Sequence, residues 1–283
     1  KVASQPLAKN GSAALWDIGD GVVCLEFTSK MNSIDLDIMK MINKAIEIVQ
    51  KDYKALVIYN EAQNFSVGAN LGLALFAANC ALWPLIQQLV GDGQQSYKAL
   101  KYAPFPVVGA PSGMALGGGC EILLHCDAVQ AHAETYMGQV EVGVGLIPAW
   151  GGCKEMLGRW LNHHKRPGGA MVAIGKVFEM LGTAVVAKSA FEAKDLLFIK
   201  EKDEITMNRD RLLADAKRKA LELAKDYHPP QEHTYSLPGG VARVALSMAV
   251  KGFVKAGKAT AYDEIVSKHL ATILSGGDVD IME

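Results

Sequence analysis

One stretch of the chain, residues 105–152, limits the fold more than any other part of the sequence. It opens with a predicted apolar strand at 106–109, and three consecutive glycines at 117–119 then precede a helical pattern that begins near Cys120. Glycines at such a point let the backbone approach a ligand closely, and the first N–H groups of a helix have no partner within it. An electron-rich oxygen is the natural ligand there. In the structural alternative, the glycines only permit tight packing and Glu121 only complements the helix dipole.

Predicted strands and helices alternate along the rest of the chain. Apolar runs at 14–18 and 22–27 are separated by Gly-Asp-Gly, which predicts a hairpin. An apolar stripe with helical spacing follows over 38–51, after Ser33 as the expected N-cap. Two further buried strands are predicted at 55–59 and 128–132. This alternation is typical of the α/β class.

Several more helices are predicted around this core. Residues 71–102 are mostly helix-forming, with breaks expected at Pro84 and at the Gly-Asp-Gly of 91–93. Beyond residue 200, three helical segments are predicted: 208–226, 241–256 and 261–275.

The composition excludes several classes of function. Half of the 283 residues are apolar and the net charge is −1, so the chain can bury a large core and has no general attraction to nucleic acid. No apolar run is long enough to span a bilayer, and no stretch has the pattern of a signal peptide. We therefore expect no nucleic-acid partner and no membrane insertion.

The five cysteines are odd in number and scattered along the chain, which favours free thiols in a reducing compartment and a cytoplasmic location. Cys120 and Cys126 flank Glu121 and His125, so a metal cluster has to be considered. Because neither a paired C-x-x-C nor an H-x-x-x-H accompanies them, we expect no metal site. His125 is expected to find its hydrogen-bond partner within the helix.

Three linked segments resemble the signature of the crotonase (enoyl-CoA hydratase/isomerase) family. They read ALGGGCE at 115–121, GQVE at 138–141 and PAWGG at 148–152. Segments such as SKMNSI and NFSVGANL resemble one group of the family in particular. This group is the hydratase domain at the C-terminal end of bacterial fusion proteins that also contain a 3-hydroxyacyl-CoA dehydrogenase. The resemblance extends over about residues 15–278. It implies a crotonase fold, in which a spiral of repeated ββα units is followed by a C-terminal helical region.

The resemblance also implies a division of the chain. Residues 1–13 would be a linker or tail, residues 14–200 the crotonase core, and residues 201–283 the C-terminal helical region. The sequence ends where the helices of the family would continue, so we expect that this helical region is truncated.

Roles for individual residues follow from the resemblance. The backbone N–H groups of Ala69 and Gly118 would hold the thioester oxygen of the substrate in an oxyanion hole. Glu121 would take a proton from water, and Glu141 would deliver a proton to C2. Contacts to the acyl group and to coenzyme A would come from seven further positions: Ser66, Gly68, Asn70, Leu71, Gly117, Pro148 and Trp150.

The implied activity is the hydration of trans-2-enoyl-CoA to 3-hydroxyacyl-CoA in fatty-acid β-oxidation. Coenzyme A enters only as part of the acyl-CoA substrate, and NAD would belong to the fused dehydrogenase domain, so no cofactor of this domain is expected. The resemblance also allows a homo-oligomer.

Two alternatives remain beside the hydratase. One is a Δ3–Δ2 enoyl-CoA isomerase of the same fold, although isomerases typically keep one catalytic carboxylate and this chain has both. The other is a domain that binds acyl-CoA or holds an assembly together without catalysis. Two departures from the family pattern give it weight: Gly72 replaces a lysine that meets the CoA phosphates in some hydratases, and Trp150 replaces a small residue. Asn70, which replaces Asp, is a further departure from the family pattern.

Overall fold

A computed structural model of the chain describes residues 5–163 and 168–277. The chain forms two compact units, and each is built from two separate stretches. The first unit comprises residues 1–138 and 187–231, and the second comprises residues 139–186 and 232–283. Residues 201–231, which the resemblance assigns to the C-terminal helical region, belong to the first unit.

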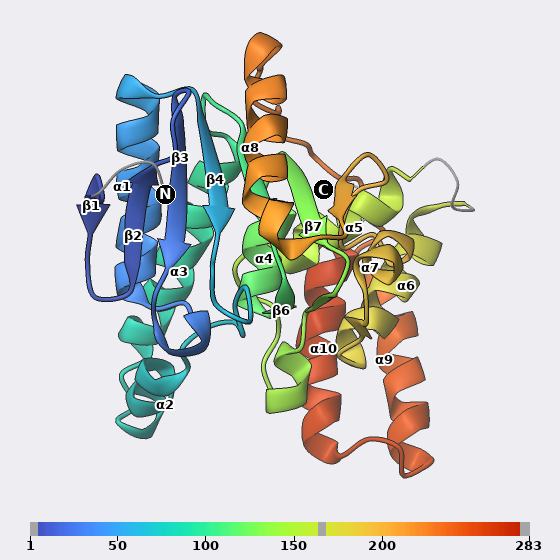
Figure 1. Ribbon diagram of the computed structural model, residues 1–283. Coiled ribbons are helices and arrows are strands. Elements are labelled where there is room, and N and C mark those ends of the chain that lie inside the picture. The colour runs from blue at the N-terminus through green and yellow to red at the C-terminus, as the bar shows by residue number, and fades with distance from the viewer. Residues whose placement is uncertain (1–4, 164–167, 278–283) are drawn as a thin grey trace. The chain divides into compact units, whose positions relative to one another are not determined.

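A seven-stranded sheet runs through the described part of the first unit, in the order β1-β2-β3-β4-β5-β7-β10 (Figure 1). Neighbours are antiparallel from β1 to β3 and parallel from β3 to β10. Every strand predicted in this sheet is confirmed to within one residue, and β1 lies in the stretch expected to be a linker. The bounds are β1 (Ala8–Lys9), β2 (Ala13–Asp17), β3 (Val22–Phe27), β4 (Ala55–Tyr59), β5 (Val107–Ala110), β7 (Ala128–His132) and β10 (Glu204–Thr206).

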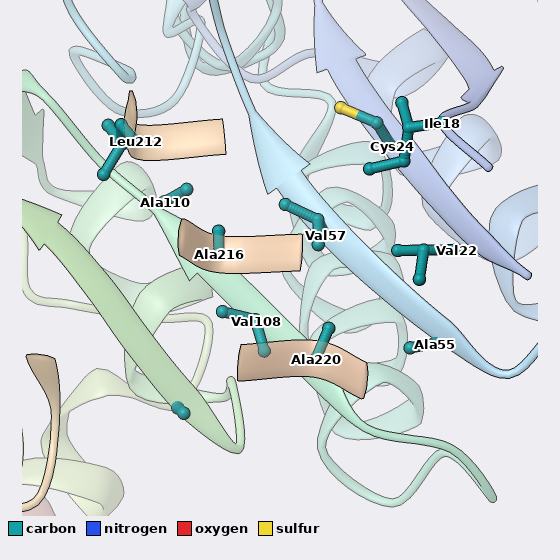
Figure 2. Close-up of a cluster of buried hydrophobic side chains, with 11 residues drawn as sticks. Ile18, Val22, Cys24, Ala55, Val57, Val108, Ala110, Leu212, Ala216 and Ala220 are labelled. Carbon is teal, nitrogen blue, oxygen red and sulfur yellow. The ribbon is translucent and has the colours of Figure 1, made fainter. Parts of the chain in front are cut away.

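One face of this sheet is covered by α8 (Leu212–Leu223), as Figure 2 shows. Leu212, Ala216 and Ala220 follow one another at helical spacing and pack against strand residues such as Val57 and Val108. Alanine on the helix and small or branched residues on the strands allow the two to approach closely. The helix predicted at 208–226 is confirmed, with 3-10 turns η3 (Arg209–Arg211) and η4 (Ala224–Asp226) at its two ends.

The opposite face carries α1 (Leu36–Asp52). Successive side chains of a strand point to opposite sides, so both faces of the sheet have side chains that a helix can cover. Before it, η1 (Lys30–Asn32) forms a single turn. The expected N-cap at Ser33 is wrong: Asp35 caps α1, and its side chain accepts a hydrogen bond from the Ile38 N–H at 2.9 Å. A carboxylate two residues further on thus takes the place of the hydroxyl.

Two helices, α2 (Gly72–Asn79) and α3 (Trp83–Lys101), fill the stretch predicted as helical at 71–102. The break before Pro84 is confirmed, and the proline stands in the first turn of α3. The break expected at 91–93 is wrong, because α3 continues through both glycines. A glycine in a helix costs about 1 kcal/mol, and the buried face of α3, which packs against α1, offsets that cost.

A second sheet, in which β6 (Gly113–Leu116), β8 (Thr135–Gly138) and β9 (Val186–Ala187) lie side by side in that order, leads to the glycines. In it, β6 runs parallel to β8. Helix α4 (Gly118–Leu124) follows β6 almost directly, two residues before the predicted start at Cys120 (Figure 1). The short helix α7 (Ala190–Asp195) completes this part of the chain.

The second unit is helical in its described residues. It contains η2 (Glu141–Val144), α5 (Gly152–Leu161), α6 (Ala170–Gly182), α9 (Gly240–Lys255) and α10 (Ala261–Ser275). The two last helices agree with the prediction, and α10 packs against α5, α6 and α9. Among the described helices of the chain, none is long and apolar enough to cross a membrane.

Candidate active site

The loop at 64–70 connects the end of β4 to α2 and is fixed at its start by Asn60. This side chain is 2% exposed. Its Nδ2 donates to the Phe65 carbonyl at 2.7 Å, and its Oδ1 accepts from the Phe27 N–H at 2.6 Å. A buried amide with both ends satisfied holds the loop firmly against the sheet.

Ser66 continues this anchoring in the middle of the loop. It is fully buried, its N–H donates to the Met114 carbonyl at 2.9 Å, and its hydroxyl donates to the Asn32 carbonyl at 2.7 Å. The same hydroxyl accepts from the Gly68 N–H at 3.2 Å. Ser66, which was expected to contact substrate, uses its hydroxyl to join the Asn32 carbonyl to the Gly68 N–H.

Ala69 lies between two hydrogen bonds that join the loop to Ile34. The Ile34 N–H donates to the Gly68 carbonyl, and the Asn70 N–H donates to the Ile34 carbonyl, both at 2.8 Å. This pairing leaves the Ala69 N–H on the other side of the loop. It has no acceptor among the residues that the structure describes.

The start of α4 supplies a second unpaired N–H group. Gly117 has φ 52° and ψ −126°, a conformation that favours glycine. Its N–H donates to the Gly138 carbonyl and its own carbonyl accepts from the Glu121 N–H, both at 2.9 Å. The Gly118 N–H, between these two bonds, has no acceptor within the described ranges.

The loop and the start of α4 touch through glycines. A Cβ placed on Gly119 would lie 2.6 Å from the Ser66 Cβ, and one placed on Gly68 would lie 3.5 Å from the Gly118 nitrogen. These close approaches bring the backbone at Gly68, next to Ala69, beside the backbone at Gly118. Both unpaired N–H groups therefore belong to one small region of the first unit, as an oxyanion hole would require.

Glu121 stands in the first turn of α4, three residues after Gly118, and is 2% exposed. Its carbonyl oxygen accepts a hydrogen bond from Nδ1 of His125 at 2.7 Å. His125 is thus a satisfied helix histidine, as predicted. A buried carboxyl group one turn from an unpaired N–H group is a candidate for proton transfer.

Asn70 and Leu71 occupy the exposed end of the loop. The Asn70 side chain accepts a hydrogen bond from the Gly72 N–H at 3.0 Å, through an oxygen that an aspartate would also offer. The departure from the family pattern at this position therefore preserves the local turn. Leu71 is 41% exposed and is free to contact a ligand.

Glu141 belongs to the second unit and begins η2. Its Oε2 atom is buried and has no hydrogen-bond partner among the described residues. Burial raises the pKa of this carboxyl from 4.5 to about 7, against the opposing effect of the backbone N–H groups of Val140 and Glu141 itself. A carboxyl group with such a pKa can both hold and release a proton near neutral pH.

Pro148 and Trp150 lie in the same unit, just before α5. Pro148 is buried and its carbonyl accepts from the Cys153 thiol at 3.4 Å, whereas Trp150 is half-buried. Gly151, between Trp150 and α5, has φ 106°, so the segment turns sharply after the indole.

The predicted site residues thus divide between the two units. The structure gathers those of residues 66–71 and 117–121 in the first unit, and it places Glu141, Pro148 and Trp150 in the second. Asn60 was missed, although a polar residue at the end of a buried strand is a signal that could have pointed to it. Across residues 5–163 and 168–277, no group of three or more His, Cys, Asp or Glu side chains could hold a metal ion.

The enoyl-CoA hydratase/isomerase family model matches residues 17–219 of the chain. This chain belongs to that family. The match confirms the resemblance seen in the three glycine- and glutamate-containing segments.

Curated relatives are longer proteins. A "Probable 3-hydroxyacyl-CoA dehydrogenase" of Bacillus subtilis is 41% identical over 274 residues, which cover 96% of this chain and 34% of the relative. A "Fatty acid oxidation complex subunit alpha" of Idiomarina loihiensis is 33% identical over 145 residues, which cover 49% of this chain and 20% of the relative. The chain therefore spans about a third or less of the length of these relatives.

Solved structures confirm the crotonase fold. An enoyl-CoA hydratase from Bacillus anthracis superimposes with a TM-score of 0.63 at 18% identity, over 93% of this chain and 90% of that protein. An enoyl-CoA hydratase from Polaromonas sp. JS666 gives a TM-score of 0.62 at 20% identity, over 93% and 91% of the two chains.

Proposed function

We propose that this chain catalyses the addition of water to a trans-2-enoyl-CoA, giving a 3-hydroxyacyl-CoA. The observation that carries the proposal is the pair of unpaired N–H groups at Ala69 and Gly118, with the buried carboxyl group of Glu121 one turn away. Membership of the enoyl-CoA hydratase/isomerase family supports the same reaction class.

The two N–H groups act on the thioester oxygen. When water adds at C3, negative charge develops on this oxygen as the enolate forms. Backbone donors that are fixed before the reaction stabilise this charge without reorganisation, and one such donor contributes about 3–4 kcal/mol to the transition state. The hydrogen bonds around Ser66, Gly68 and Gly117 fix these donors.

Glu121 and Glu141 share the proton transfers in this proposal. Glu121 takes a proton from the attacking water, and Glu141 delivers a proton to C2 of the enolate. The pKa of Glu141, about 7, supports its role as the acid. Because hydration removes a proton from the attacking water and delivers a proton to C2, the presence of two glutamates favours a hydratase over an isomerase.

A direct test follows the absorbance of the enoyl group of crotonyl-CoA and of a C10 trans-2-enoyl-CoA. The wild-type chain should consume both, and Glu121→Gln and Glu141→Gln should each lower kcat by about 10²–10⁴. Glu134→Gln, a matched change at an exposed glutamate, should leave kcat unchanged. Turnover of a 3-enoyl-CoA to the 2-enoyl isomer without hydration would replace the hydratase with the isomerase. Binding without any turnover would favour the non-catalytic alternative.

The product of this reaction is the substrate class of a 3-hydroxyacyl-CoA dehydrogenase, which is how the Bacillus subtilis relative is named. We therefore propose that the hydratase works beside such a dehydrogenase, with NAD bound by the dehydrogenase and coenzyme A entering only with the substrate. We also propose that the protein is cytoplasmic and forms a homo-oligomer. Formation of NADH from crotonyl-CoA by the full-length protein tests the coupling.

A further inference from the structure

The glycines that begin α4 leave the backbone with little conformational preference of its own. Glycine reaches more of φ/ψ space than any other residue and loses more freedom when it is fixed. A donor placed on such a segment is only as well positioned as the contacts that restrain it. Two of these contacts are backbone hydrogen bonds at Gly117, and a third is the packing of Gly119 on Ser66.

A further restraint comes from a side chain of a different helix. Tyr97 of α3 is fully buried, and its hydroxyl donates to the Gly118 carbonyl at 2.9 Å. The two residues are 21 positions apart in the sequence. A carbonyl oxygen has two lone pairs, so it can accept this bond in addition to one within its own helix.

Tyr97 is itself held in place by its surroundings. It lies on the buried face of α3 together with Gly93, Ser96 and Leu100. The neighbouring Ser96 hydroxyl accepts a hydrogen bond from Nδ2 of Asn43 on α1 at 3.3 Å, which ties α3 to the helix that covers the sheet. The tyrosine hydroxyl is therefore a fixed point for the flexible glycines.

The ring of Tyr97 also contacts the C-terminal end of α4, where His125 is the C-cap. It packs against the ring of His125, with centroids 5.5 Å apart and planes inclined by 58°. His125 Nδ1 in turn contacts the Glu121 carbonyl at 2.7 Å, and because a carbonyl oxygen only accepts, this nitrogen carries the proton. One side chain thus restrains the Gly118 carbonyl directly, on the same residue as the donor N–H, and restrains the backbone of Glu121 through the histidine.

We infer that Tyr97 is a positioning residue for the oxyanion donor at Gly118 and for Glu121. This inference rests on the proposed hydratase function. Tyr97 touches no substrate in this assignment, and it acts by holding the backbone of residues 118–121 in place.

Tyr97→Phe removes the hydroxyl alone and keeps the packing on His125. We expect kcat for crotonyl-CoA to fall about tenfold with KM within about twofold, because a misplaced oxyanion donor weakens transition-state binding more than ground-state binding. The absorbance of bound 4-dimethylaminocinnamoyl-CoA adds a spectroscopic readout. Its red shift depends on hydrogen bonds to the thioester oxygen and should be smaller in the variant.

Tyr227→Phe is the matched control. The Tyr227 hydroxyl also donates to a backbone carbonyl, that of Ala103 at 3.3 Å, and it contacts the carboxylate of Asp127 at 3.1 and 3.2 Å. These groups precede β5 and β7, whereas the loop at Asn60 follows a parallel strand, so the control lies at the other end of the sheet. Its loss should lower Tm and leave kcat and the red shift unchanged.

Hydrogen exchange of the peptide that covers residues 117–124 separates this inference from the proposed function. Exchange should be faster in Tyr97→Phe than in the wild type and unchanged in Tyr227→Phe. If the wild type hydrates nothing, the proposed function fails, and the exchange comparison still decides whether Tyr97 holds this segment. Equal kcat, equal red shift and equal exchange in Tyr97→Phe and the wild type would overturn the inference.

Discussion

Glu141 is predicted to make the stability of the protein depend on pH in the direction opposite to an ordinary paired carboxylate. Burial raises its pKa from 4.5 to about 7, so between these two values the folded chain holds a proton that the unfolded chain has released. Stability therefore falls as the pH rises through this window. The difference between the two pKa values corresponds to about 3 kcal/mol at high pH, and solvent screening of this half-buried side chain reduces it to about 2–3 kcal/mol.

Glu141→Gln replaces the carboxyl with an amide of nearly the same shape that never ionises. In urea denaturation, the wild type should lose about 2 kcal/mol of unfolding free energy between pH 5 and pH 8 through this group, and the variant should not. At pH 8 the variant should therefore be more stable than the wild type, although it is expected to be inactive. Glu134→Gln, at an exposed position, serves as the control. Equal pH dependence in the Glu141 variant and the wild type would refute the reasoning.

Three further outcomes are expected. The wild-type kcat for crotonyl-CoA should fall as the pH rises through about 7, because the Glu141 carboxyl must be protonated to act as the acid; a flat profile to pH 9 would exclude this role. Gly119→Ala should lower kcat at least about tenfold, since its Cβ would lie 2.6 Å from the Ser66 Cβ and must displace the start of α4; a normal kcat would show that the segment can adjust. Trp150→Ala should shift the chain-length profile measured from C4 to C16 enoyl-CoA, and an unchanged profile would remove Trp150 from the acyl site.

The strands and most helices were predictable because their signals are local. Apolar runs bounded by glycine or polar residues, as at 22–27 and 55–59, determine both the element and its burial. The break at Pro84 was predictable for the same reason, because a proline lacks an N–H and restricts the residue before it. The glycines at 117–119 predicted that two backbone segments approach each other closely, and the structure shows this close approach.

The parts that sequence reasoning missed depend on tertiary contacts. Nothing near Gly91 and Gly93 shows that α3 is held in one piece by the helix against which it packs. Asp35 caps α1, although Ser33 was expected to do so. Both residue types can cap a helix, and the path of the preceding turn decides which of them does. Tyr97 looks like an ordinary helix residue until the fold brings its hydroxyl to the Gly118 carbonyl.

The oxyanion stabilisation expected of the first unit depends on backbone N–H groups. This dependence explains at which positions the residue type can vary. A backbone N–H is present at any residue except proline, so the identity of Ala69 matters less than the path of the chain through it. That path requires glycine at Gly68 and Gly119, where a side chain would meet the Leu116 carbonyl or Ser66. Asn70, by contrast, keeps its turn with an amide in place of a carboxylate. The fold can therefore persist at 18% identity to a solved hydratase while side chains around the loop diverge. Differences in substrate preference should be sought at such side chains rather than at the two N–H donors of Ala69 and Gly118.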